Sequence, residues 1–159
     1  PNIKDKNVHF LIAGDGELRD ELEEKVIALN ISDKVKFIGA VSYEQVPYLM
    51  SGADYFIVPS VDEGFGRVVI EAMAMNLPVL ASKVGGIKDI IEDEKNGFFF
   101  TSKSSTDILH VINKVLNYPT ENIEVIVKNA YSKVHNNYEY SIGMKKYINL
   151  YKTILSSKK

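Results

Sequence analysis

Short apolar runs recur along the first hundred residues of this chain, and a helical pattern separates each run from the next. A run that is apolar throughout, rather than at alternate positions, is typical of a strand buried on both faces of a parallel sheet. The sequence therefore predicts an α/β fold with a Rossmann-like, doubly wound parallel sheet of five or six strands in three α/β/α layers. The predicted strands are Val8–Ala13, Val35–Gly39, Asp54–Val58, Pro78–Ser82 and Gly97–Thr101.

Helices are predicted between these strands, and the pattern beyond Thr101 is wholly helical. Ser42 is expected to cap the second helix, and Pro47 is expected to bend or shorten it. The length of 159 residues suits one domain with its own core, so we assign residues 1–159 to a single domain. The first four predicted helices are Glu17–Asn30, with Leu18, Leu22, Val26 and Leu29 on one face, then Ser42–Ser51, Arg67–Met75 and a short helix from Gly85–Gly86 to Ile91.

Composition excludes several classes of protein. The formal net charge of −2 leaves no basic surface for nucleic acid. The longest apolar runs are a handful of residues, whereas a membrane span needs roughly 20. The chain has no cysteine, which excludes disulfides and thiolate catalysis. No signal peptide is visible, so we expect a cytoplasmic location, and the Pro–Asn start suggests a piece of a longer protein.

The loops that follow the strands are the places to look for a ligand, because doubly wound sheets bind ligands outside the carboxyl ends of their strands. Four such loops, at residues 14–17, 39–43, 60–67 and 82–87, are polar or rich in glycine. In the third loop, Gly64 and Gly66 have no Cβ and would let the backbone approach a ligand closely. The helix that begins at Gly66 or Arg67 offers unpaired N–H groups to an anion such as a diphosphate.

Two glutamates flank this helix start. Glu63 precedes it, and its carboxylate is expected to point into the cleft, while Glu71 lies about one turn inside the helix. Carboxylates are strong acceptors for paired hydroxyls, so the pair is suited to a ligand with a hydroxyl-rich group on each side of a diphosphate. Considered one at a time, each glutamate also has a simpler explanation. Glu71 could form only an ion pair with Arg67, and Glu63 could be only a charged turn residue.

The first loop, Gly14–Asp15–Gly16, departs from the dinucleotide-binding fingerprint. After the two glycines, Arg19 stands where a third glycine or alanine is expected. A helix cap by Asp15 is the simpler explanation of this segment alone.

Together these residues resemble a known family. The segment from Glu63 to Glu71, read as Glu-Gly-Phe-Gly-x-Val-x-x-Glu and followed by Ala-Met-Ala, is similar to the signature of the family-four retaining glycosyltransferases of GT-B fold. Further blocks match in order and spacing from about Val8 to Phe99. They are Ile12–Gly16, Val35–Gly39, Ala53–Asp54, Val58–Ser60, Asn76–Ser82, Gly85–Gly86 and Asn96–Gly97.

The resemblance implies a role for each residue of the motif. It implies that Glu63 contacts hydroxyls of the donor sugar and that Glu71 holds the ribose hydroxyls. Arg67 stands where the family commonly has an apolar residue. The residues implied to contact the donor sugar and diphosphate are Gly64, Phe65, Gly66, Arg67 and Val68. The base is implied to lie against Ala40 and Val41, and Gly14 and Gly16 of the first loop are further implied binding residues.

The resemblance also implies what lies outside this chain. GT-B enzymes have two Rossmann-like domains with catalysis between them, and this chain matches only the second. An N-terminal domain in the same protein is therefore the expected partner. The apolar face of a last helix within residues 139–159 is expected either to pack on this domain or to cross to the N-terminal one. The basic Arg and Lys pair that the family places upstream is not found here. We expect this chain alone to bind nucleotide weakly and to transfer nothing.

The substrate that the resemblance implies is a nucleotide-sugar donor, most simply UDP- or GDP-linked, with no resident cofactor and no metal. The three histidines of the chain do not have the spacing of metal ligands, and they are expected in structural or surface positions. They are His9, His110 and His135. The implied setting is polysaccharide or glycolipid synthesis at the inner face of a membrane, reached through the N-terminal domain. Two alternatives stay open: a GT-B-fold sugar-nucleotide epimerase, and a non-catalytic nucleotide-binding subunit of a split glycosyltransferase.

Overall fold

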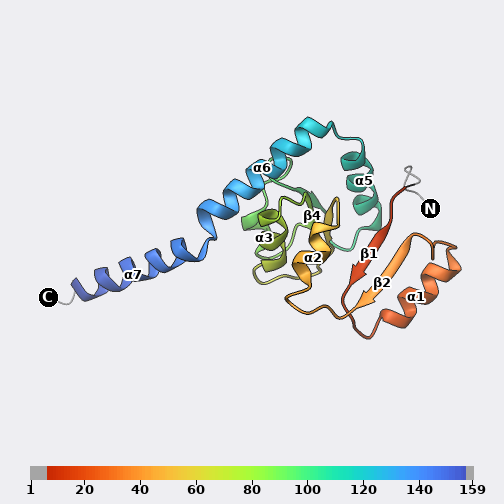
Figure 1. Ribbon diagram of the computed structural model, residues 1–159, viewed down its shortest axis with the longest axis horizontal. Helices are drawn as coiled ribbons and strands as arrows, with labels where there is room; N and C mark the ends of the chain where they lie inside the picture. Colours follow the sequence, from red (N-terminus) through yellow and green to blue (C-terminus); the bar gives the residue numbers. More distant parts are fainter. Residues whose placement is uncertain (1–6, 157–159) are drawn as a thin grey trace.

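The computed structural model describes residues 7–156 of the chain (Figure 1). Strands and helices alternate up to Phe100, and three helices then follow in succession, which is the α/β order predicted by the apolar runs. The strands are β1 (Phe10–Ala13), β2 (Val35–Gly39), β3 (Phe56–Val58), β4 (Val79–Ser82) and β5 (Phe98–Phe100). The helices are α1 (Arg19–Ala28), α2 (Val46–Ser51), α3 (Arg67–Ala74), α4 (Ile87–Ile90), α5 (Ser105–Leu116), α6 (Thr120–Asn137) and α7 (Tyr140–Ser156).

All strand pairs are parallel, as expected, but they form two ladders rather than one continuous sheet. β1 pairs with β2, and β4 lies between β3 and β5. Among the described residues no backbone ladder joins β1 to β3, which is only three residues long. The two ladders meet through side chains instead, since Phe10, Tyr55 and Ile57 pack against the same apolar cluster.

β4 is the centre of the three-stranded ladder, and its side chains alternate between two apolar clusters. Val79 and Ala81 pack with residues of α2, α3, α4 and α6 on one face. Leu80 packs with Phe98 and with residues of α5 and α6 on the other. Side chains of a strand point alternately to opposite faces. Because both faces of β4 are covered, all its residues are buried, and only Ser82 at its end is polar. The three α/β/α layers are thus confirmed around β3–β5.

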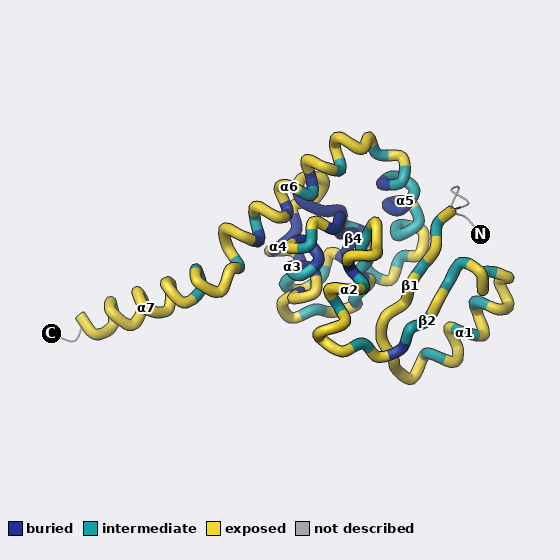
Figure 2. Tube along the Cα trace, viewed as in Figure 1, coloured by how far each residue is buried: buried dark blue, intermediate teal, exposed yellow. Residues whose placement is uncertain are grey.

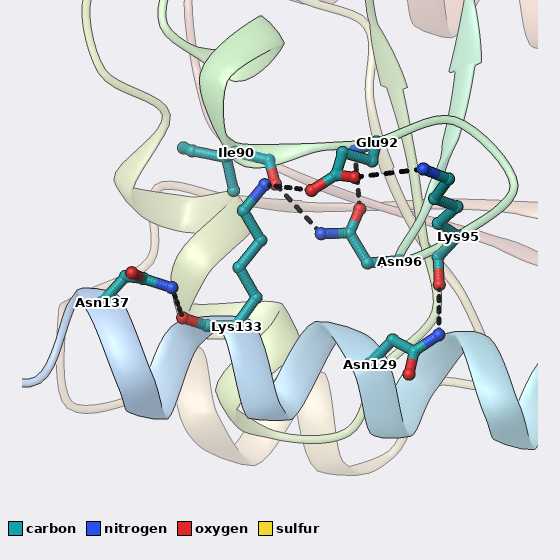
Figure 3. A network of polar contacts seen from close by, with 7 residues as sticks. All are labelled: Ile90, Glu92, Lys95, Asn96, Asn129, Lys133 and Asn137. Atoms are coloured by element: carbon teal, nitrogen blue, oxygen red, sulfur yellow. Dashed lines mark hydrogen bonds and ion pairs between the residues drawn. The ribbon is translucent and has the colours of Figure 1, made fainter.

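Helix α6 is fastened to the loop between α4 and β5 by a polar network (Figure 3). Lys133 Nζ donates to Glu92 Oε1 at 3.0 Å, and Asn129 Nδ2 donates to the Lys95 carbonyl at 2.9 Å. Asn96 is 4% exposed, and its side chain accepts from the Glu92 N–H and donates to the last carbonyl of α4. The network therefore holds α6 beside α4 and α3, with which it shares the first apolar cluster.

Three parts of the chain are poorly covered (Figure 2). The prediction that the first strand is buried was wrong, since Leu11 of β1 is 51% exposed and only Phe10 of this strand packs on one of the two apolar clusters. Helix α1 has no buried residue, and Leu18 on its predicted apolar face is 64% exposed. Helix α7 projects away from the rest of the molecule and also has no buried residue (Figures 1 and 2). Within residues 7–156, no helix combines the length and apolar character that crossing a membrane requires.

Helix α2 begins later than the sequence predicts. Ser42 does not cap it, because the helix starts at Val46, and the Ser42 N–H instead donates to Gln45 Oε1 at 3.0 Å. Pro47 consequently lies in the first turn, where its missing N–H removes no helical hydrogen bond. The prediction of a cap at Ser42 was wrong because a turn over residues 43–45 intervenes between the loop and the helix.

The Glu92–Lys133 contact should stabilise the fold in a pH-dependent way. The hydrogen bond from Lys133, and then the charges of Lys133 and Lys95, lower the pKa of Glu92 below its ordinary 4.5. A carboxyl whose pKa is lowered on folding stabilises above its ordinary pKa, and that contribution is lost as the pH falls through the folded-state pKa. We expect Glu92→Gln to lower the thermal unfolding midpoint slightly at neutral pH, and the difference should disappear once the pH has fallen below the lowered pKa of Glu92.

The matched control is Glu124→Gln, which removes an exposed charge on α6 that has no described ion pair. Thermal unfolding of both variants and of the unsubstituted chain, followed by circular dichroism at neutral and acid pH, measures the effect. A deficit for Glu92→Gln that is equal at both pH values would contradict the assigned pKa shift.

Candidate functional site

The loops at the carboxyl ends of β1 to β4 are linked in series by contacts. The Gly14 N–H donates to the Gly39 carbonyl at 2.8 Å, which joins the first loop to the second. Tyr43, at the end of the second loop, lies beneath the guanidinium of Arg67, the first residue of α3. The Gly86 N–H donates to the Glu63 carbonyl at 2.9 Å, which joins the fourth loop to the third. The topology thus assembles the four predicted loops along one edge.

Glu63 lies across the start of α3. Its Oε1 accepts a hydrogen bond from the Gly66 N–H at 3.1 Å, and its own N–H donates to Asp62 Oδ1 at 2.9 Å. The sequence suggested that this carboxylate points into the cleft. In the structure, one of its oxygens is bound to the loop backbone. A negative charge at this place also complements the positive end of the helix dipole.

The two glycines of the third loop differ in what requires them. Gly66 is buried with φ of +86°, and a Cβ there would lie 3.1 Å from the side chains of Ile87 and Ile90. Its glycine is explained by backbone conformation and by packing on α4. Gly64 has neither constraint, since a Cβ there would meet no atom within 4 Å. The open space beside Gly64 therefore remains accessible to a ligand.

Gly85 and Gly86 bring the fourth loop into backbone contact with the third. A Cβ on Gly85, where φ is +41°, would lie 1.8 Å from the Glu63 carbonyl oxygen. A Cβ on Gly86 would lie 2.7 Å from the Gly64 carbonyl oxygen and 2.8 Å from Phe65 Cα. Real Cβ atoms do not approach this closely, so the glycine pair is what allows the two loops to touch.

Glu71 and Arg67 lie on the same side of α3. Arg67 Nε is 3.2 Å from Glu71 Oε1, so the simple ion pair that the spacing predicts is present. The side chain of Glu71 is 23% exposed, whereas that of Arg67 is 73% exposed. The N–H groups of Arg67 and Val68 are the first of the helix and have no partner within it. The helix start thus offers N–H donors with a carboxylate on either side.

The second loop places Ala40 and Val41 between Gly39 and Tyr43. Ala40 is exposed and Val41 is half-buried, so both are accessible at the edge of the site. Gly14 contacts this loop through its hydrogen bond to Gly39, and within residues 7–156 no hydrogen bond or ion pair links Gly14 or Gly16 to Glu63. Sequence reasoning gave no role to Tyr43, although its place at the end of a ligand-side loop was a signal.

Phe65, at the tip of the third loop, contacts the far end of α6. Its ring meets that of Tyr138 edge to face, with the centroids 6.1 Å apart. Tyr138 caps the carboxyl end of α6 and packs against the first apolar cluster. The third loop is therefore supported from α6 as well as from Gly85–Gly86.

A shallow hollow, which sequence reasoning missed, opens at the carboxyl ends of β4 and β5. It adjoins the third loop, because Ser102 Oγ donates to the Ser60 carbonyl at 3.1 Å. Nothing in the local sequence pattern distinguishes this hollow from an ordinary strand-to-helix turn. Its lining residues are Lys83, Phe99, Phe100, Thr101, Ser102 and Asp107.

Within residues 7–156, no three His, Asp or Glu side chains are grouped so as to hold a metal ion. His135 stacks on Tyr131 and lies 3.5 Å from Glu139, and His9 Nδ1 is 3.2 Å from the Asn7 carbonyl. Both are local surface contacts.

The close approach at Gly85 should make this position intolerant of any side chain. Gly85→Ala would force the Glu63 carbonyl away and strain a positive φ, so we expect a loss of about 2 kcal/mol or more in unfolding free energy. The measurement is chemical denaturation at equilibrium. Gly143→Ala is the matched control, because a Cβ there meets nothing within 4 Å. Equal stability of the two variants would contradict this account of the contact.

Loss of the Tyr138 ring should loosen the third loop. We expect Tyr138→Ala to increase hydrogen–deuterium exchange at the amides of residues 63–66, because Phe65 loses its edge-to-face partner. Tyr131→Ala is the control, because it removes a tyrosine ring from an exposed position of α6. It should leave the exchange of those amides unchanged. Unaltered exchange of the loop in Tyr138→Ala would show that the contact does not support it.

Comparison with known proteins shows the family to which this chain belongs. The model of the family described as Glycosyl transferases group 1 matches residues 1–133. An uncharacterized glycosyltransferase of Methanocaldococcus jannaschii is 37% identical over 153 residues, which cover 96% of this chain and 39% of that protein. An alpha-D-kanosaminyltransferase of Streptomyces kanamyceticus is 31% identical over 114 residues, covering 72% of this chain and 30% of the enzyme.

The fold matches as well as the sequence. The crystal structure of HepE from Anabaena in complex with UDP-glucose aligns with a TM-score of 0.82 and 29% identity, over 93% of this chain and 42% of that one. The chain therefore spans less than half the length of each of these relatives. With the family match extending over most of its residues, this chain belongs to the group 1 glycosyl transferases.

Proposed function

We propose that this chain binds the nucleotide-sugar donor of a retaining glycosyltransferase, whose acceptor is bound by an N-terminal domain of the same protein. The observation that carries the proposal is the placing of two carboxylates, Glu63 and Glu71, on either side of the open start of α3. The crystal structure of HepE in complex with UDP-glucose supports the same class of ligand for this chain.

The layout of the site agrees with the layout of such a donor. The hexose would lie beside Glu63 and the open space at Gly64, and the diphosphate would accept from the N–H groups of Arg67 and Val68. The ribose hydroxyls would donate to Glu71, and the base would lie along Ala40 and Val41. A helix N-terminus stabilises an anion, so it also stabilises the charge that develops on the diphosphate as its bond to the sugar breaks.

The exposed helix α7 supports the two-domain part of the proposal. Tyr147, Tyr151 and Leu155 are more than 60% exposed on a helix that projects away from the core (Figure 1). Burial of large apolar side chains is favourable, and a helix with such a face is normally packed against something. We assign α7 as the segment, within residues 139–159, that packs on the N-terminal domain.

Titration with nucleotides tests the proposed site. UDP, GDP and ADP, each alone and as a sugar conjugate, are added to the 159-residue chain, and binding is followed by ligand-observed NMR, which detects weak complexes. We expect one base to be preferred, with a dissociation constant on the order of 1 mM. Glu71→Ala should remove this binding because the ribose hydroxyls lose their acceptor, and no sugar should be transferred by this chain alone.

Glu124→Ala is the control, since it removes an exposed carboxylate from α6, away from the site. A failure of every nucleotide to bind at millimolar concentration, with Glu71→Ala behaving as Glu124→Ala does, would refute the assigned site. Where binding is seen, the same titration with a longer protein that includes the N-terminal domain measures the affinity that this domain adds.

A further inference from the structure

Arg67 is held between two groups that come from different parts of the site. Its Nε is 3.2 Å from Glu71 Oε1, and its guanidinium carbon lies 5.5 Å from the centre of the Tyr43 ring. Tyr43 belongs to the loop after β2, whereas Arg67 and Glu71 lie on α3. The guanidinium therefore connects the base-side loop to the helix start.

The stability of the fold does not account for this arrangement. The side chain of Arg67 is 73% exposed and Tyr43 is 67% exposed, so neither is part of the core. Exposed ion pairs four residues apart on a helix contribute little, since water and salt screen the charges. An exposed cation over an aromatic ring is also a weak contact. Tyr43 and Arg67 therefore lie at the ligand edge although the core does not require them there.

The charge of the site gives Arg67 a use. The ligand-side loops carry the carboxylates of Asp15, Glu17, Asp62 and Glu63 against one lysine, Lys83, and Glu71 adds a further carboxylate. A nucleoside diphosphate brings further negative charge, while the helix N-terminus offers only about half a positive charge. A cation at the first residue of α3 lies where the phosphates would approach those N–H groups.

The geometry of the guanidinium suits this use. Arginine has five donors in a planar fork, and it binds phosphate with two hydrogen bonds at once. In this structure Nε lies 3.2 Å from Glu71 Oε1, and the guanidinium carbon lies over the Tyr43 ring. Among the described residues, Arg67 forms no ion pair with a carboxylate other than Glu71, and its contact with Glu71 is made through Nε. The terminal nitrogens are therefore the donors that a phosphate would reach.

We propose that Tyr43, Arg67 and Glu71 form one clasp for a nucleoside diphosphate, in which the terminal nitrogens of Arg67 bind the diphosphate while Glu71 binds the ribose. The proposal rests on the proposed function, from which it takes the role of Glu71. Arg67 is a binding residue in this clasp, and Tyr43 is a positioning residue that keeps the guanidinium plane in place. In this proposal Arg67 has a binding role at a position where the family that the sequence resembles commonly has an apolar residue.

Arg67→Met tests the clasp, because it keeps a flexible side chain and removes the charge. The variant is titrated with UDP and GDP and with the nucleosides uridine and guanosine. We expect the diphosphate that binds the unsubstituted chain to bind about tenfold more weakly, and the matching nucleoside to lose much less. The affinity for the diphosphate should also become less sensitive to salt. Lys128→Met, which removes an exposed charge on α6, should show none of these effects.

Tyr43→Ala and Tyr43→Phe test the positioning role. We expect Tyr43→Ala to weaken the diphosphate about threefold, since the guanidinium loses its aromatic support. Tyr43→Phe keeps the ring and should keep the affinity. Tyr48→Ala removes a tyrosine that is 80% exposed on α2 and has no cation over its ring among the described contacts, so it should behave as the unsubstituted chain does.

The outcomes separate this proposal from the one on which it rests. If no diphosphate binds the unsubstituted chain, the proposed function and the clasp both fail. If a diphosphate binds and Glu71→Ala abolishes its binding, but Arg67→Met is no weaker than Lys128→Met, the clasp alone is wrong. An equal loss for the diphosphate and its nucleoside in Arg67→Met would also overturn it, because the phosphates would then not be what Arg67 binds.

Discussion

The arrangement of the site depends on a backbone contact between two loops. The Gly86 N–H donates to the Glu63 carbonyl, and the absence of a Cβ on Gly85 lets the two chains come this close. The fourth loop is itself fixed by β4, in which every residue is buried. Because α3 begins four residues after Glu63, the packing of β4 in the core ultimately sets where the open N–H groups of α3 point.

A second constraint is the balance of charge at that helix start. Glu63 engages the backbone N–H of Gly66, and Glu71 is paired with Arg67, so each carboxylate already has a partner at the site. Such contacts hold both side chains in defined positions before any ligand arrives, which lowers the entropy lost on binding. Tyr43 extends this preorganisation to the loop after β2.

Support also comes from the long helix that follows the sheet. α6 is held to the α4–β5 loop by Lys133 and Asn129, and Tyr138 at its end contacts Phe65 in the third loop. The same helix leads directly into α7, whose apolar side chains are exposed. The loop that flanks the proposed donor site is therefore in contact with the segment through which α7 joins the domain.

The fold was predictable where burial alone decides the pattern. β4 is buried at every residue and apolar at all but its last, so its position follows closely from its residues. β2 was also predicted with its observed bounds, although its Lys36 is exposed. The division into two ladders was not predictable, because it depends on how the short β3 lies beside β1. The start of α2 was also missed, since Ser42 satisfies its N–H through Gln45 in a turn that resembles a cap in sequence.

Sequence by itself determined the class of fold, the family and the spacing of Glu63, Arg67 and Glu71. These follow because residues four apart on a helix share a side and because apolar periodicity reports burial. Only the tertiary structure decided that Tyr43 lies beneath Arg67, that Gly85 and Gly86 touch the Glu63 loop, and that Tyr138 meets Phe65. Such contacts join residues distant in the chain, and their geometry is set by how the layers pack, which no local pattern of residues encodes.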